Sequence, residues 1–216
     1  MNRFFRMKEP VNTWTHFITF LTAIAGLVYL ILLSQENLSK LVTMTVYGSS
    51  LILLYGASSL YHWVRVTPGK ELILKKLDHI AIYLLIAGSY TPVFYYGLSG
   101  VWKWSMLVSV WLLAGIGAFL KIWFVHAPRS ISTVFYVTLG WIAVIPFFQL
   151  VSSLPTGAMI LMIGGGLVYT VGALIYATKC FDFVPGRFGF HEIFHLFVMA
   201  GSALHFVMIS HYILPL

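Results

Sequence analysis

Seven long apolar stretches constrain the fold of this chain more than any other feature of its sequence. They cover residues 14–33, 41–64, 77–96, 102–125, 131–151, 157–177 and 191–213. Each has roughly the 20 residues that an α-helix needs to cross a bilayer. The stretches are apolar on every face and lack strand alternation, which favours helices over a barrel. We therefore predict an all-α integral membrane protein, a bundle of seven transmembrane helices that forms a single domain over residues 1–216.

The low charge content excludes an ordinary soluble domain. Only 9% of the residues are charged and 60% are hydrophobic, whereas about a quarter of a soluble domain is charged. The net charge of +7 does not indicate a nucleic-acid partner, because basic residues of a membrane protein are explained first by topology. The single cysteine, Cys180, excludes an internal disulfide.

The basic residues predict the orientation of the bundle. Of the 13 Lys and Arg residues, eleven lie in the N-terminus or at the ends and following loops of the second, fourth and sixth helices. Only Lys40 and Lys103 lie on the opposite side. Because Lys and Arg are enriched on the cytoplasmic side, we predict a cytoplasmic N-terminus and an outer C-terminus.

Prolines and glycines predict two local features of the helices. Pro92 and Pro146 lie inside the third and fifth stretches, where a missing N–H donor kinks a helix. The three consecutive glycines at 164–166 allow close contact between helices. Neither feature identifies a function.

Polar side chains collect at the predicted cytoplasmic ends of the helices. An ionisable group within a spanning segment costs a few kcal/mol on insertion scales, so it normally faces the bundle interior and has a partner or a task. Four separate stretches of chain bring such groups to one depth. They are Glu9, Asn12 and His16 at the first helix, Ser58 and His62 at the second, Asp78 and His79 at the third, and His191, Glu192 and His195 at the seventh.

The spacing of the histidines predicts a metal site at this depth. His191 and His195 are four residues apart, so on a helix their imidazoles lie on one face and can hold one metal ion. With His62 they form a set of three neutral imidazoles, which together with a water is the open tetrahedral site expected of catalytic zinc. Asp78 has a natural place beside that water, as general base or as the acceptor that orients it.

Each of these residues also has an ordinary structural interpretation. A histidine pair at a helix end can be interfacial or bonded to a backbone carbonyl, and the hydroxyl of Ser58 can bond to its own helix. Asp78 can pair with Lys75 or Lys76, which lie within one turn of it. Structural bonding is the expected role of three further histidines, His126, His205 and His211.

The segment from His191 to His195 also matches the H-E-x-x-H motif, in which the glutamate is the base of a zinc protease. Here the motif opens a membrane helix, and no convincing downstream carboxylate offers a third ligand. A protease is therefore the less favoured interpretation.

Three motifs in order resemble the hemolysin III branch of the progestin and adipoQ receptor (PAQR) family. They are Glu9-x-x-Asn12-x-x-x-His16 before the first helix, Ser58-x-x-x-His62 ending the second with Asp78 opening the third, and His191-x-x-x-His195 opening the seventh. The resemblance covers nearly the whole chain, including helix number and orientation, and three ordered motifs are far more specific than one.

This resemblance implies a zinc ion held by His62, His191 and His195. It also implies that Asp78 contacts the zinc-bound water, and that Ser58 is the family serine one turn before the first ligand. Eukaryotic relatives are similar to lipid amide hydrolases of the ceramidase type, whereas bacterial members carry the hemolysin name and are linked to membrane homeostasis. A multi-pass protein of the bacterial plasma membrane is implied.

Three classes of function follow as hypotheses. The preferred one is a zinc-dependent hydrolase of a lipid amide or ester, with a membrane lipid as substrate or ligand, because ligands at cytoplasmic helix ends lie at the depth of an acyl linkage. The second is a membrane-permeabilising protein or channel, which the hemolysin name indicates, although no polar stripe runs along a helix. The third is a membrane-homeostasis sensor in which zinc is structural.

Overall fold

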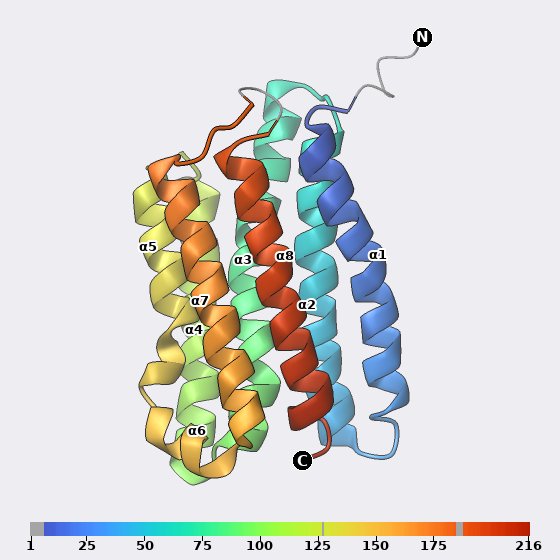
Figure 1. Cartoon of the computed structure of the whole chain (residues 1–216), viewed down its shortest axis with the longest axis vertical. Coiled ribbons are helices and arrows are strands. Elements are labelled where there is room, and N and C mark those ends of the chain that lie inside the picture. The colour runs from blue at the N-terminus through green and yellow to red at the C-terminus, as the bar shows by residue number, and fades with distance from the viewer. Residues whose placement is uncertain (1–6, 127, 185–187) are drawn as a thin grey trace.

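The computed structural model describes residues 7–126, 128–184 and 188–216, and these residues form helices joined by short connections (Figure 1). The long helices are α1 (Pro10–Leu32), α2 (Leu38–Trp63), α3 (Pro68–Gly97), α4 (Gly100–Trp123), α7 (Thr156–Thr178) and α8 (Phe190–Met208). The shorter elements are α5 (Arg129–Gly140), the 3-10 helix η2 (Ile142–Val144), α6 (Phe147–Ser153) and the π-helical η3 (Ile209–Ile213), which continues α8. Extended pairing in the described residues is limited to one isolated bridge, between Val184 and Phe188. The all-α prediction is confirmed.

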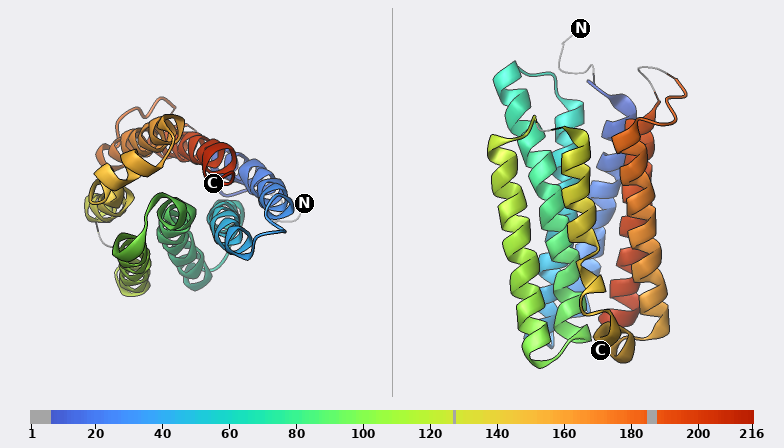
Figure 2. Two further views of the ribbon diagram at one scale, coloured as in Figure 1. Left: turned by 90° about the horizontal axis from the view of Figure 1, so that it is seen from below. Right: turned by 90° about the vertical axis from the view of Figure 1, so that its left-hand side faces the viewer.

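The helices stand side by side in a ring that follows chain order from α1 through α5 to α7 and α8 (Figure 2). Each contacts the next, and α8 contacts α1 as well as α7, which closes the ring. Side chains such as Tyr47, Phe94 and Met208 are fully buried inside it. Other apolar side chains, such as those of Leu112 and Phe148, point outwards and are exposed. An outer surface of this kind suits hydrocarbon as the surrounding solvent.

Five of the described helices are long and apolar enough to cross a membrane, and each overlaps a predicted segment. They are Pro10–Leu32, Leu38–Trp63, Gly100–Trp123, Thr156–Thr178 and Phe190–Ile213. The pair Ser130–Val144 and Phe147–Ser153 adds a sixth if it is taken as one bent span, and α3 is outside this set. A helical membrane bundle is thereby confirmed, while the number of seven spans and the orientation stay predictions.

The prediction of one helix over residues 131–151 is wrong. α5 ends at Gly140, and the chain bends by 53° between Ser130–Val144 and Phe147–Ser153. Pro146 lies at the break, where its missing N–H interrupts the helical hydrogen bonds, and its carbonyl accepts from Leu150 to start α6. The kink that the sequence predicts at Pro146 is therefore present, as a break between two helices. α3, in contrast, continues through Pro92 as a single helix.

α3 begins at Pro68, well before the predicted start at residue 77. Proline suits the first helical turn because its missing N–H needs no partner there, and Glu71 places a negative charge at the positive end of the helix. Asp78 therefore lies about three turns inside the helix and not at its opening.

Close packing of α7 on α8 depends on Gly165. A Cβ at this position would clash with the His205 ring, whose Nε2 lies 3.2 Å from the carbonyl oxygen of Met162 and can donate to it. The expected close glycine contact occurs at Gly165, while Gly164 faces open space. Structural bonding was also the role expected for His205.

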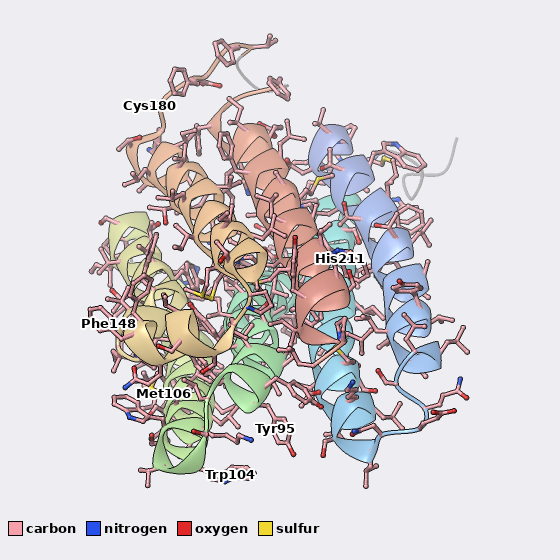
Figure 3. The ribbon with its side chains drawn as sticks, turned by 60° about the horizontal axis from the view of Figure 1, so that its bottom comes forward. Tyr95, Trp104, Met106, Phe148, Cys180 and His211 are labelled. Carbon is pink, nitrogen blue, oxygen red and sulfur yellow. The ribbon has the colours of Figure 1, made fainter. Side chains whose placement is uncertain are left out.

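The predicted orientation can be tested with Cys180, the only cysteine of the chain. It is exposed in the connection between α7 and α8, and Figure 3 shows it at the opposite end of the bundle from Tyr95 and Trp104. A membrane-impermeant maleimide should label Cys180 in inverted membrane vesicles and not in intact cells. The matched control, Ser99→Cys in a Cys180→Ser background, should show the reverse pattern. Labelling of Cys180 in intact cells would mean that the orientation is inverted.

Candidate metal centre

Three imidazoles from two helices come together at the end of the bundle where α1 begins. His62 is the next-to-last residue of α2, while His191 and His195 lie in the first turns of α8. One ring nitrogen of each lies within 4.8 Å of the others, and the His62 ring centroid is 5.1 Å from that of His191 and 4.9 Å from that of His195. The histidines selected from the sequence therefore form one cluster that could hold a metal ion.

The nitrogen atoms of this cluster fit a metal ion. His62 and His195 have exposed fractions of 0% and 3%. The Nε2 of His62 and the Nδ1 of His195 are buried and find no hydrogen-bond partner among the described residues. A buried polar atom without a partner is costly, and a metal cation that binds neutral imidazole nitrogen would remove that cost.

Glu9, which immediately precedes α1, orients His62. Its Oε2 accepts a hydrogen bond from Nδ1 of His62 at 2.6 Å, so Nε2 is the nitrogen left to bind a metal. Two backbone hydrogen bonds fix this approach, because the N–H groups of Glu9 and Lys8 donate to the carbonyls of His62 and Trp63 at 3.0 and 3.1 Å. A carboxylate on one ring nitrogen sets the tautomer and direction of the other, as is usual for metal-binding histidines.

The Glu9 carboxyl is held in its ionised form. Burial raises its pKa, but the hydrogen bonds from His62 and Asn12, together with attraction to His62 and His191, outweigh burial and lower the pKa to about 2. At neutral pH the group is therefore a carboxylate that accepts hydrogen bonds from both side chains.

Asn12 connects Glu9 to Glu192. Its Nδ2 donates to Oε2 of Glu9 at 2.9 Å and to Oε1 of Glu192 at 2.8 Å. The other carboxylate oxygen of Glu192 accepts from the N–H of Gly189 at 2.8 Å, at the start of α8. Glu192 thus caps its own helix and binds Asn12. Because both of its carboxylate oxygens are engaged in these contacts, the arrangement does not support a role as a protease base. The sequence placed Glu9, Asn12 and Glu192 at a common depth without assigning their contacts.

His16 forms a wall of the cluster. It is buried in α1, and its ring stacks on that of His195, with centroids 3.8 Å apart and planes at 13°. This stack fixes the plane of the His195 ring. The only signal for it in the sequence was the spacing of His16 from Glu9 and Asn12.

Ser58 lies on the wall of a cavity of about 590 Å³ that reaches the histidines. Its exposed fraction is 1%. The neighbouring Ser59 hydroxyl donates to the carbonyl of Tyr55 at 2.7 Å, whereas no hydrogen bond of the Ser58 hydroxyl is found within the described part of the chain. The structure therefore does not support the interpretation that Ser58 is bonded to its own helix.

Asp78 lies on the same cavity wall, on α3. It is half-buried, and none of the ion pairs formed by the described residues includes it. The alternative that Asp78 is paired with Lys75 or Lys76 is therefore not supported by the described contacts.

The cavity continues from the histidines along the interior of the bundle. On α3 its wall runs from Lys75 to Val93, which corresponds to about 27 Å of helix. On α8 it runs from His191 to Met208. Ionisable groups gather at the histidine end and the deeper wall is mostly apolar, so the cavity has the character of a site for an amphiphile.

The structure defines the class of this protein as a helical membrane bundle with a histidine cluster at one end of an internal cavity. Comparison with known sequences identifies the family within that class. The profile of the haemolysin-III-related family matches residues 4–206. The chain is 37% identical to Hemolysin-3 of Bacillus cereus over 213 residues, 98% of this chain and 94% of that protein. It is 38% identical to the Hemolysin-3 homolog of Bacillus subtilis over 211 residues, 96% of each.

A more distant relative is the human protein named Monocyte to macrophage differentiation factor, which is 27% identical over 213 residues, 95% of this chain and 84% of that protein. The chain therefore belongs to the haemolysin-III-related family, and the resemblance to the hemolysin III branch of the PAQR family is confirmed. It is a multi-pass protein of the cell membrane.

Replacing Glu9 by Gln should weaken metal binding by about 10- to 100-fold, the usual effect of losing a carboxylate behind a metal-binding histidine. The change can be measured by competition with a chelator of known affinity on the purified protein. Glu36→Gln, at an exposed position in the connection between α1 and α2, is the matched control and should bind metal as the wild type does. Equal affinity in the Glu9→Gln protein would contradict the orienting role.

Proposed function

We propose that this protein is a zinc-dependent hydrolase that cleaves an amide or ester bond of a membrane lipid. The observation that carries the proposal is the continuity between the histidine cluster and the amphiphilic cavity, whose wall includes Ser58 and Asp78. A hydrolase for lipids needs a site where an acyl chain and an attacking water can meet. The polar end of this cavity offers such a place.

His62, His191 and His195 are the proposed ligands, and three neutral imidazoles are a donor set that zinc accepts readily. When bound, zinc supplies Lewis acidity toward a carbonyl oxygen and an attacking water. Glu9 keeps Nε2 of His62 directed at the ion, and His16 holds the plane of His195. These contacts reduce the reorganisation that metal binding requires.

Asp78 is proposed as the group that takes the proton from the attacking water. Its carboxylate is half-buried on the cavity wall and has no ion-pair partner among the described residues, so it remains available as a base. The buried hydroxyl of Ser58 is proposed to donate a hydrogen bond to the water or to the developing oxyanion.

The substrate is proposed to be a membrane lipid whose acyl chain lies along the apolar depth of the cavity. In that pose the acyl linkage, which separates the polar head from the chain, remains at the histidine end. With the predicted orientation, this end faces the cytoplasmic leaflet.

Replacing Asp78 by Asn should leave zinc bound and lower turnover by at least about 100-fold, the lower range for loss of a general base. The assay is release of fatty acid from a panel of lipid amides and esters, with zinc content measured on the same samples. Glu36→Gln should retain full turnover. Full turnover by Asp78→Asn with a lipid that the wild type hydrolyses would exclude the assigned role.

The hydrolase and a membrane-permeabilising protein can be distinguished by replacing the three histidines of the cluster. If the protein acts as a hydrolase, replacing His62, His191 and His195 together by Ala should abolish lipid hydrolysis. Purified wild-type protein should then release no more dye from liposomes than a protein-free control. Dye release that persists in the triple variant would favour a pore in which the histidines have no part.

A further inference from the structure

Lys121 is a buried cation within a spanning helix that has no carboxylate partner. It lies near the end of α4 with an exposed fraction of 5%. Its Nζ donates to the Oγ of Ser132 on α5, a neutral group. All six Asp and Glu residues lie in the described part of the chain, and none forms an ion pair with Lys121. Because a buried charge in a membrane bundle normally has a partner, this lysine calls for an anion from outside the chain.

The cavity that reaches the histidines also reaches Lys121. α4 and α5 lie across the ring from α1 (Figure 2), so Lys121 occupies the side of the cavity away from Glu9. Lys75 of α3, which is half-buried, lines the cavity as well and adds a second positive charge. Asp78 is the acid on the α3 wall.

Hydroxyl groups surround the lysine on the α5 side. Ser132 and Thr133 are buried on the cavity wall. The ring of Tyr136, which also lines the cavity, has its centroid 5.9 Å from Nζ of Lys121. Since the Oγ of Ser132 already accepts from Lys121, its O–H is directed to donate elsewhere. An oxyanion would satisfy both the charge and these donors.

We propose that this part of the cavity, between α3, α4 and α5, binds the oxyanion of an amphiphile, a carboxylate or a phosphate, with Lys121 as its counter-ion. The apolar depth of the same cavity takes the alkyl chain. The inference rests on the proposed function in one respect, since it names acidic lipids as the class of substrate or product that enters the metal centre.

The test is displacement of radiolabelled palmitate from the purified full-length protein in neutral detergent. Unlabelled palmitate, hexadecyl phosphate and hexadecanol are the competitors, so that the carboxylate and phosphate arms are separated from an uncharged control of the same chain length. The wild type should prefer at least one of the two anions over hexadecanol by about tenfold or more, as expected for a charge-assisted hydrogen bond.

Lys121→Met should remove this preference while hexadecanol binds as before, and Lys121→Arg should keep most of it. Lys40→Met is the matched control, because Lys40 lies in the first turn of α2, away from the cavity, and should bind as the wild type does. If Lys121→Met does not fold, Tyr136→Phe gives a second measurement, with a severalfold loss of anion binding expected.

The same series on chelator-treated protein separates Lys121 from the metal centre, which could itself bind a carboxylate. Preference for the anion that persists without metal and disappears in Lys121→Met supports the subsite. Preference that disappears on chelation and is unaffected by Lys121→Met overturns it, as does a wild type that binds hexadecanol as tightly as both anions. A protein that selects anions through Lys121 but hydrolyses no lipid would refute the proposed hydrolase and retain this site.

Discussion

Hydrocarbon solvates neither carboxylates nor imidazole nitrogens, so each such group that this chain keeps near its histidines needs a partner inside the protein. Glu9 meets this requirement with His62 and Asn12, and Glu192 meets it with Asn12 and the start of α8. These bonds are charge-assisted and lie at one end of the bundle, where they are shielded in part from water. These contacts link the start of α1 to the end of α2 and to the first turn of α8.

The contacts that orient the histidines are also the contacts that close the ring. Glu9 and Asn12 belong to the beginning of the chain, His62 to the end of α2, and Glu192 to α8. A metal held by His62, His191 and His195 would therefore join the same helices as this hydrogen-bonded chain of side chains. Metal binding and packing of α8 against α1 and α2 are then expected to support each other, because a ligand that binds only the packed state stabilises it.

The sequence was sufficient for the helical class, for most helix positions and for the grouping of polar residues at one depth, because apolar length and helix direction determine all three. Pro146 indicated a kink in the fifth stretch, but the sequence did not indicate that α5 ends at Gly140 and that the chain continues as separate short helices. It also did not specify that Glu9 bonds to His62 or that His16 stacks on His195. Those contacts depend on the rotation of each helix about its axis, and helices that are apolar on every face contain little periodicity from which rotation can be inferred.

The two sides of the cavity differ in charge. On the α1 side, Glu9 and Glu192 supply negative charge that would compensate a zinc ion bound by neutral histidines. On the α4 side, Lys121 has no such compensation within the chain. Under the two proposals, an acidic amphiphile would be drawn to the Lys121 side, because the carboxylates behind the histidines reduce the attraction of the metal centre for a further anion. Its uncharged acyl carbonyl would then be the group left to approach the histidines, which is the arrangement that hydrolysis at that centre requires.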